Sequence, residues 1–125
     1  MIGLGVDVVD LERFAAVLER RPTITDRLFT IGERTYCERA VAAPATRVER
    51  YAARFAVKEA VLKALGVGLG ACGWHEIEVE RAESGAPSVV LTGQAATLAK
   101  ERNVATWHVS ITHDHNAAYA TVIAE

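Results

Sequence analysis

The chain has 125 residues, which is enough for one compact domain spanning residues 1–125 with a modest hydrophobic core. Half of the residues are apolar and the formal net charge is -2, so the composition argues against a disordered chain and against a nucleic-acid binder, which needs a clear basic excess. The opening segment carries two acids and does not look like a secretion signal, and no apolar run reaches the ~20 residues of a membrane span. The two cysteines show no metal or redox spacing. We therefore expect a cytoplasmic protein.

The first predicted element is a strand over residues 2–9. Its apolar residues alternate with two glycines and Asp7, so we expect one apolar face and one face of small residues and an acid. Asp10 is a suitable N-cap for a helix over residues 10–21, which Pro22 ends. A second, shorter helix is predicted over residues 32–42.

The longest predicted element is a helix that begins near Arg47 and is closed by Gly66. After a glycine-rich loop, the alternating segments 76–81 and 88–93 predict a hairpin, and an amphipathic helix is expected over 92–103. Two more strands follow, over the ranges 106–112 and 117–124. The last of them is apolar on both faces, which indicates a central strand or one buried against another subunit.

Charged residues interrupt the apolar stripe of the long helix. Glu59 lies within the stripe, Lys58 flanks it, and Lys63 follows one turn later. One interpretation is an ion pair between Glu59 and Lys63, with Lys58 extending to solvent. The other starts from Asp7, because aspartate is unfavourable within a strand unless it caps a nearby group or binds something. Asp7 and Glu59 together would provide the two carboxylates that Mg²⁺ requires.

The histidines suggest a competing metal site. His108, His113 and His115, together with Asp114, could be zinc ligands, although they are divided between a strand and a turn and no second shell is evident. His113 also ends a polar strip, where it could serve a proton or a phosphate.

Two further features allow more than one interpretation. The glycine-rich loop after the long helix resembles a dinucleotide-binding turn in composition, but it follows a helix instead of a strand, which favours a structural role. A basic set lies in and around the first helix at near-helical spacing, and it predicts either a solvated face or a docking surface for an acidic partner. The set comprises Arg13, Arg20, Arg21 and Arg27.

Three segments together resemble the holo-acyl-carrier-protein synthases, the short bacterial class of 4′-phosphopantetheinyl transferases. They are GVDVVDLERF, RFAVKEAVLKALG and HVSITHDHNAAYATVI, and the likeness extends in order and spacing over nearly the whole chain. The resemblance implies an α+β fold, with a small antiparallel sheet packed on one long helix, assembled as a homotrimer with an active site at each subunit boundary.

The resemblance also implies a reaction and its catalytic residues. The 4′-phosphopantetheine of coenzyme A would pass to a serine of apo acyl carrier protein, and adenosine 3′,5′-bisphosphate would leave. By their positions in the motifs, Asp7 and Glu59 would hold Mg²⁺ against the pyrophosphate, Lys63 would neutralise charge there, and His113 would match the histidine of the closing motif. The base that takes the serine proton is left open between a water, Asp114 and another group.

Further residues are assigned by the same resemblance. Arg54, Lys58 and Gly66 match positions around the coenzyme, as do Lys63 and His113. Arg13 matches the arginine that meets the acidic recognition helix of the carrier protein, and we expect Arg20 and Arg21 to extend that surface. The loop 67–70 departs from the family's usual Gly-Thr-Gly.

The rival functions are a trimeric module that binds coenzyme A or an acidic protein without transfer, and a zinc hydrolase. The sequence leaves open whether the carrier serves fatty-acid or polyketide synthesis, and whether acylated coenzyme A is accepted.

Overall fold

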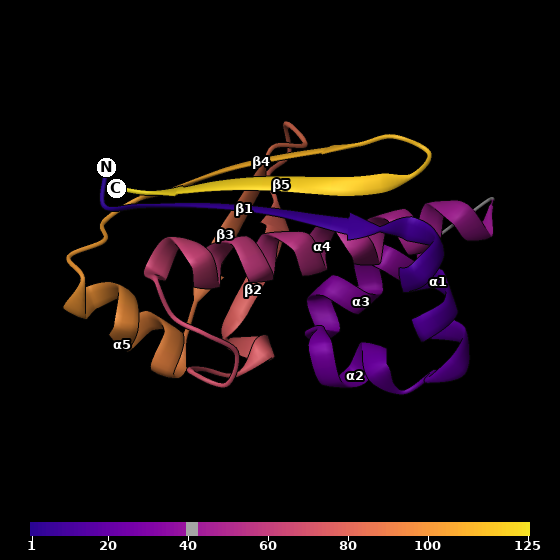
Figure 1. The fold of residues 1–125 in the computed structure, drawn as a ribbon, viewed down its shortest axis with the longest axis horizontal. Coiled ribbons are helices and arrows are strands. Elements are labelled where there is room, and N and C mark those ends of the chain that lie inside the picture. The colour runs from indigo at the N-terminus through magenta and orange to yellow at the C-terminus, as the bar shows by residue number, and fades with distance from the viewer. Residues whose placement is uncertain (40–42) are drawn as a thin grey trace.

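The computed structural model describes residues 1–39 and 43–125. In chain order the elements are β1 (Gly3–Asp10), α1 (Leu11–Arg20), α2 (Ile24–Leu28), α3 (Ile31–Glu38), α4 (Pro44–Leu65), the 3-10 helix η1 (Trp74–Glu76), β2 (Ile77–Arg81), β3 (Pro87–Leu91), α5 (Gly93–Glu101), β4 (Trp107–His113) and β5 (Ala117–Ala124). One three-stranded sheet lies along α4, and the other helices and the β2–β3 hairpin surround that helix (Figure 1). This arrangement confirms the predicted α+β fold.

The predicted elements differ from the observed ones mainly around α2 and α3. The short helix α2 was not predicted, and α4 begins at Pro44 instead of Arg47, with the proline in the first helical turn where its missing N–H costs nothing. α3 ends at Glu38, and residues 40–42, the predicted end of that helix, lie outside the described residues. Among the described helices, none is both long and apolar enough to cross a membrane.

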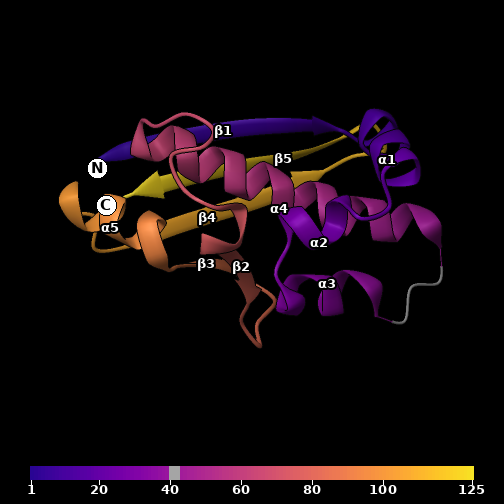
Figure 2. The ribbon, with the colours of Figure 1, turned by 90° about the horizontal axis from the view of Figure 1, so that it is seen from below.

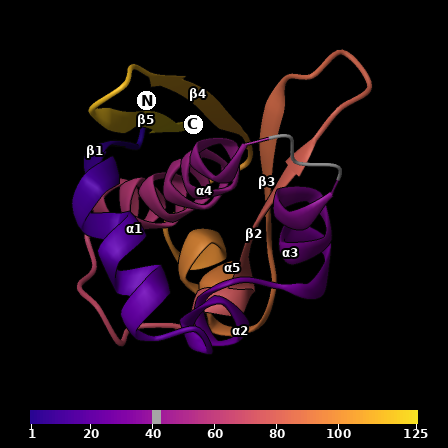
Figure 3. The same ribbon diagram turned by 90° about the vertical axis from the view of Figure 1, so that its right-hand side faces the viewer.

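The strand order of the main sheet is β1-β5-β4, with both pairs antiparallel. β5 is therefore the central strand, as its apolar character predicted, and Figure 2 shows it between β1 and β4. β2 and β3 form a separate hairpin, which stands on the opposite side of α4 from α1 (Figure 3). The molecule thus offers two different flanks of α4, one beside β1 and α1 and one beside the hairpin and β4.

Two glycines allow β1 to lie directly on α4. A Cβ atom at Gly3 would collide with the carbonyl oxygen of Ala64, and one at Gly5 with that of Ala60. The two glycines therefore allow the backbone of β1 to approach the backbone of α4 closely. Because side chains alternate along a strand, Asp7 lies on the same face as these glycines and is directed at α4.

The apolar face of β1 points away from the core. Leu4, Val6 and Val8 are 52%, 53% and 57% exposed, and Tyr119 on the neighbouring strand is 38% exposed. The helices cover only the other face of the sheet (Figure 1). A sheet face with this much exposed aliphatic surface is typical of a protein–protein interface.

Candidate active site

The two predicted metal ligands come together beside Lys63. Asp7 on β1 and Glu59 on α4 line a hollow of about 420 Å³, which Lys63 and Arg13 also line. The Lys63 ammonium donates to Asp7 Oδ1 at 3.0 Å and to the Val6 carbonyl oxygen at 2.8 Å. The Asp7 side chain is only 16% exposed. The strand and the helix thus hold the two acids rigidly. Lys63 forms its ion pair with Asp7 on β1, and not with Glu59 as one interpretation of the sequence had predicted.

The electrostatics of Glu59 reflect this crowding. Burial, followed by the negative charge of Asp7, raises the pKa of Glu59 above its usual value, while Lys63 acts in the opposite direction. Two partly buried carboxylates therefore lie near one ammonium group, which among the described residues is paired with Asp7 alone. A divalent cation would relieve the repulsion between them and hold both in the ionised form.

The donor set fits Mg²⁺. Mg²⁺ is usually held by one or two carboxylates and completes its octahedron with waters and phosphate oxygens. Within residues 1–39 and 43–125, no group of three or more His, Cys, Asp or Glu is placed to hold a metal. The zinc alternative therefore finds no ligand set there, and His108 instead contacts Glu125, with 3.1 Å between Nε2 and Oε1.

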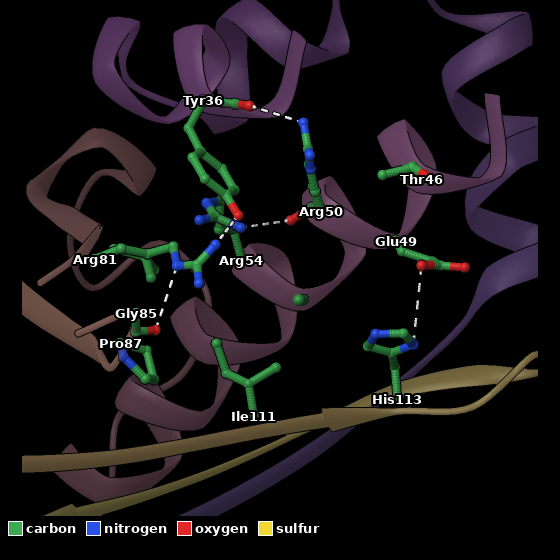
Figure 4. Close-up of a pocket in the computed structure, with 12 residues that line it drawn as sticks. Tyr36, Thr46, Glu49, Arg50, Arg54, Arg81, Gly85, Pro87, Ile111 and His113 are labelled. Atoms are coloured by element: carbon green, nitrogen blue, oxygen red, sulfur yellow. Dashed lines mark hydrogen bonds and ion pairs between the residues drawn. The ribbon is translucent and has the colours of Figure 1, made fainter. Parts of the chain in front are cut away.

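A second, basic pocket lies on the other flank of α4, beside the hairpin and β4. It has a volume of about 330 Å³, and Figure 4 shows its polar side chains converging from α3, α4, β2 and β4. The residues that give the pocket its chemistry are Tyr36, Glu49, Arg50, Arg54, Arg81 and His113. Two of the predicted coenzyme contacts, Arg54 and His113, therefore line the same pocket.

Arg54 and His113 differ in their exposure to solvent. His113 is half exposed, and its Nδ1 lies 3.9 Å from Glu49 Oε2. Arg54 is 5% exposed and donates from Nη1 to the Arg50 carbonyl oxygen at 3.1 Å, while its buried Nε has no hydrogen-bond partner in the described part of the chain. A buried N–H without an acceptor costs free energy, which a bound anion in the pocket would recover.

Lys58 has a structural role in the core, which the sequence did not predict. It is fully buried, and its ammonium pairs with Glu33 Oε1 at 2.9 Å and donates to the carbonyl oxygens of Trp74 and Ile77. The expectation that Lys58 extends to solvent is therefore wrong. With its three protons used inside the protein, its predicted contact with coenzyme A receives no support from this geometry.

The remaining predicted residues occupy exposed positions. Arg13, Arg20 and Arg21 lie along or just after α1, and Arg13 also lines the acid hollow. Gly66 closes α4 in the left-handed conformation, with φ 73°. Hydrogen bonds from the backbone N–H groups of Asn116 and Ala117 lower the pKa of Asp114, which makes this carboxylate a poor general base.

The acid hollow and the basic pocket face different ways. Arg54 and Glu59 are five residues apart on α4, which places them about 140° apart around the helix axis. The hollow adjoins β1 and the pocket adjoins β4, the two edges of the same sheet. The family resemblance predicted Arg54 and His113, but Tyr36, Arg50 and Arg81 were missed because they come from separate segments. Only the four-residue spacing of Arg50 and Arg54 hinted at a shared face.

Comparison with known proteins is consistent across sequence and structure. The sequence model of the 4′-phosphopantetheinyl transferase superfamily matches residues 3–122. A holo-[acyl-carrier-protein] synthase of Frankia alni is 49% identical over 125 residues, covering 100% of this chain and 98% of the relative.

Solved structures give the same picture. Helicobacter pylori holo-[acyl-carrier-protein] synthase in complex with coenzyme A has a TM-score of 0.83 at 26% identity, covering 98% of this chain and 99% of that one. The Bacillus anthracis synthase in complex with CoA (3′,5′-ADP) has a TM-score of 0.80 at 30% identity, covering 99% of this chain and 96% of that one.

Proposed function

Since the chain belongs to the 4′-phosphopantetheinyl transferase superfamily, it transfers the 4′-phosphopantetheine of coenzyme A to a serine of apo acyl carrier protein, and we propose that the transfer depends on Mg²⁺ held by Asp7 and Glu59. The observation that carries the metal assignment is the pair of half-buried carboxylates beside Lys63. Bound there, Mg²⁺ would supply positive charge to the pyrophosphate oxygens.

The side chains of this protein mainly position groups and neutralise charge. Lys63 lies next to the acids and is 52% exposed, so its ammonium can meet an oxygen of the pyrophosphate or of the leaving adenosine 3′,5′-bisphosphate. The carrier serine attacks the β-phosphorus, and we assign its proton to a water because Asp114 has a lowered pKa. Arg54, His113 and the Gly66 turn complete the proposed contacts with coenzyme A.

We further propose that the active site forms between two copies of the chain. In a single chain the acid hollow lies beside β1 and the basic pocket beside β4, on different flanks of α4. A homotrimer that buries the exposed apolar face of β1 could bring the acids of one copy to the pocket of the next. One coenzyme A molecule would then contact both.

The oligomer prediction is tested by placing a charge on the sheet face. Val6→Glu is expected to convert the trimer to monomers and to abolish transfer, because an unpaired carboxylate would be buried between subunits. Analytical ultracentrifugation gives the oligomeric state, and far-UV circular dichroism checks the fold. Ile31→Glu, a matched change at an apolar residue that is 75% exposed elsewhere, should remain trimeric. A monomeric wild-type protein with full activity would contradict the proposal.

The transfer itself is tested by mass spectrometry. Apo carrier protein incubated with the enzyme, coenzyme A and Mg²⁺ should gain the mass of one phosphopantetheine group, and EDTA should prevent the gain. Full transfer in EDTA would remove the metal assignment. Binding of coenzyme A without any gain in mass would favour a non-catalytic binding module.

Charge reversal on α1 tests the carrier surface. Arg13→Glu is expected to raise the KM for apo carrier protein about tenfold or more through lost attraction to its acidic surface, and to raise the KM for coenzyme A by a smaller factor because Arg13 also lines the acid hollow. Steady-state kinetics at several salt concentrations give both values. Lys100→Glu makes the same charge change on α5, at the far end of the molecule, and should leave the KM for the carrier unaffected. Equal effects of the two variants would show that net charge, and not a docking surface, is responsible.

We also propose a single domain over residues 1–125 in the cytoplasm. Cys37 and Cys72 are both free thiols, as expected in a reducing compartment. Burial raises the pKa of Cys37 to about 12, so this thiol is unreactive.

A further inference from the structure

An arginine cluster surrounds Tyr36 at the edge of the basic pocket. The guanidinium carbon of Arg54 lies 4.1 Å from the centroid of the Tyr36 ring, and those of Arg39, Arg50 and Arg81 lie at 4.8 Å, 5.0 Å and 5.1 Å. The Tyr36 hydroxyl also accepts a hydrogen bond from Arg81 Nη1. Figure 4 shows the ring between the side chains of Arg50, Arg54 and Arg81. A single aromatic side chain thus contacts cations from α4, from β2 and from the residue that follows α3.

The positive charges of this cluster are not held in direct ion pairs in the part of the chain that the structure describes, although Glu78, Glu80 and Glu83 line the adjoining hollow. Among the described residues, none of the cluster's guanidinium groups forms an ion pair with a carboxylate. Apart from the Tyr36 hydroxyl, their acceptors are backbone carbonyl oxygens: Arg50 Nη1 donates to that of Tyr36 at 3.3 Å, and Arg81 Nε donates to that of Gly85 at 3.3 Å. Among residues 1–39 and 43–125, the buried Nε of Arg54 has no hydrogen-bond partner.

A neutral partner explains how such a cluster can persist. The π face of tyrosine attracts a guanidinium group, and its hydroxyl fixes the direction of another, without cancelling the charge of either. A carboxylate in the same place would hold the arginines more strongly but would compete with any anion that enters the pocket. Tyr36 therefore keeps the arginines in place with their charge still available.

We propose that Tyr36 is a positioning residue for the binding of coenzyme A. Its side chain holds Arg50, Arg54 and Arg81 in place as a fixed cationic surface for the phosphate groups of the coenzyme. The inference rests on the proposed function, because that assigns the basic pocket to coenzyme A. Tyr36 itself acts through the arginines, chiefly Arg81 and Arg54.

The decisive variant is Tyr36→Phe, which removes the hydroxyl and keeps the ring. The Kd and the KM for coenzyme A are expected to rise about five- to tenfold, since a hydrogen bond that orients a charged group is lost, while kcat and the KM for the carrier protein stay within about twofold. Isothermal titration calorimetry gives the Kd independently of turnover. Tyr36→Leu, which also removes the ring, should weaken binding further.

Two controls separate positioning from general stability. Tyr51→Phe makes the same chemical change between the same two helices, removing the 2.7 Å hydrogen bond from Tyr51 to Glu38 Oε2 outside the pocket. It should lower the Tm and leave the Kd for coenzyme A unchanged. In an Arg81→Met background, Tyr36→Phe should add less than about twofold, because the hydroxyl acts through Arg81.

The failures of the two proposals are distinguishable. If the wild-type protein binds coenzyme A and transfers phosphopantetheine but Tyr36→Phe binds it equally well, only the positioning role is overturned. If Tyr36→Phe dissociates the oligomer with no change in the Kd measured for the remaining trimer, the cluster serves the contact between subunits, which also overturns the role. If the wild-type protein does not bind coenzyme A, the proposed function fails first.

Discussion

Replacement of Glu59 by glutamine is expected to lower kcat by about a thousandfold or more, because the neutral amide is a poor ligand for a hard cation and the charge that holds Mg²⁺ is halved. Asp7→Asn should have an effect of similar size. Both side chains are held by rigid elements, and neither change alters side-chain volume, so the fold should persist. The measurement is steady-state transfer with the mass of the carrier protein as readout.

Thermal unfolding of the Glu59→Gln variant provides the independent check. Because the pKa of Glu59 is raised, the native state binds more protons than the unfolded state above the usual pKa of a glutamate, so ionisation of Glu59 makes the metal-free protein less stable as the pH rises through that window. Glutamine removes this penalty. In EDTA at neutral pH, the variant should therefore have a Tm equal to or above that of the wild type.

Added Mg²⁺ should then reverse the order. Mg²⁺ binds the native wild type and should raise its Tm, whereas Glu59→Gln should show no such gain. The assignment of Glu59 as a metal ligand would be contradicted if the variant had a lower Tm than the wild type in EDTA, or if Mg²⁺ raised its Tm as much as that of the wild type.

Lys58→Met is expected to destabilise the protein by about 3–5 kcal/mol, because it leaves the carboxylate of Glu33 buried without its cation. Both side chains of this pair are 0% exposed, and the Nζ–Oε1 distance is 2.9 Å. Glu33 also accepts from the backbone N–H of Val79 at 2.8 Å, so the pair joins α3, α4 and β2. Chemical denaturation at a fixed protein concentration measures the change.

A double-mutant cycle shows whether the loss comes from the pair. Removing Glu33 alone should also be costly, since it leaves the Lys58 ammonium buried without its counter-charge, but the double variant Lys58→Met/Glu33→Gln should be less destabilised than the sum of the single changes. Simple additivity would show that the two side chains act independently. Lys100→Met, at an exposed lysine, should change stability by less than about 0.5 kcal/mol.

The elements that the sequence predicted well were those with a clear local pattern. Alternation identified β4 and the hairpin. The apolar character of both faces of β5 indicated a central strand or one buried against another subunit, and in this chain it is the central strand. The carboxylate pair was also predictable, because Asp7 and Glu59 each break the pattern of their own element. A charged residue where the pattern requires an apolar one is a signal that sequence alone provides.

The features that the sequence missed depend on contacts between distant segments. Lys58 carries the same local signal as Glu59, but its partner Glu33 lies in another helix, and only the fold shows that one charge is satisfied internally while the other borders a hollow. The Tyr36 cluster draws on separate segments in the same way. Alternation in β1 identified an apolar face, but it could not say that the helices would cover the opposite one.

Complementation between subunits tests most directly the claim that the acids of one copy work with the basic pocket of the next. Glu59→Gln and His113→Ala are each expected to be nearly inactive alone at low coenzyme A concentration. Refolded together in equal amounts, they should regain about a quarter of the wild-type activity, the share of boundaries that combine intact acids with an intact pocket under random mixing. Mixed trimers, verified by native mass spectrometry, that remain inactive would show that the claim is wrong.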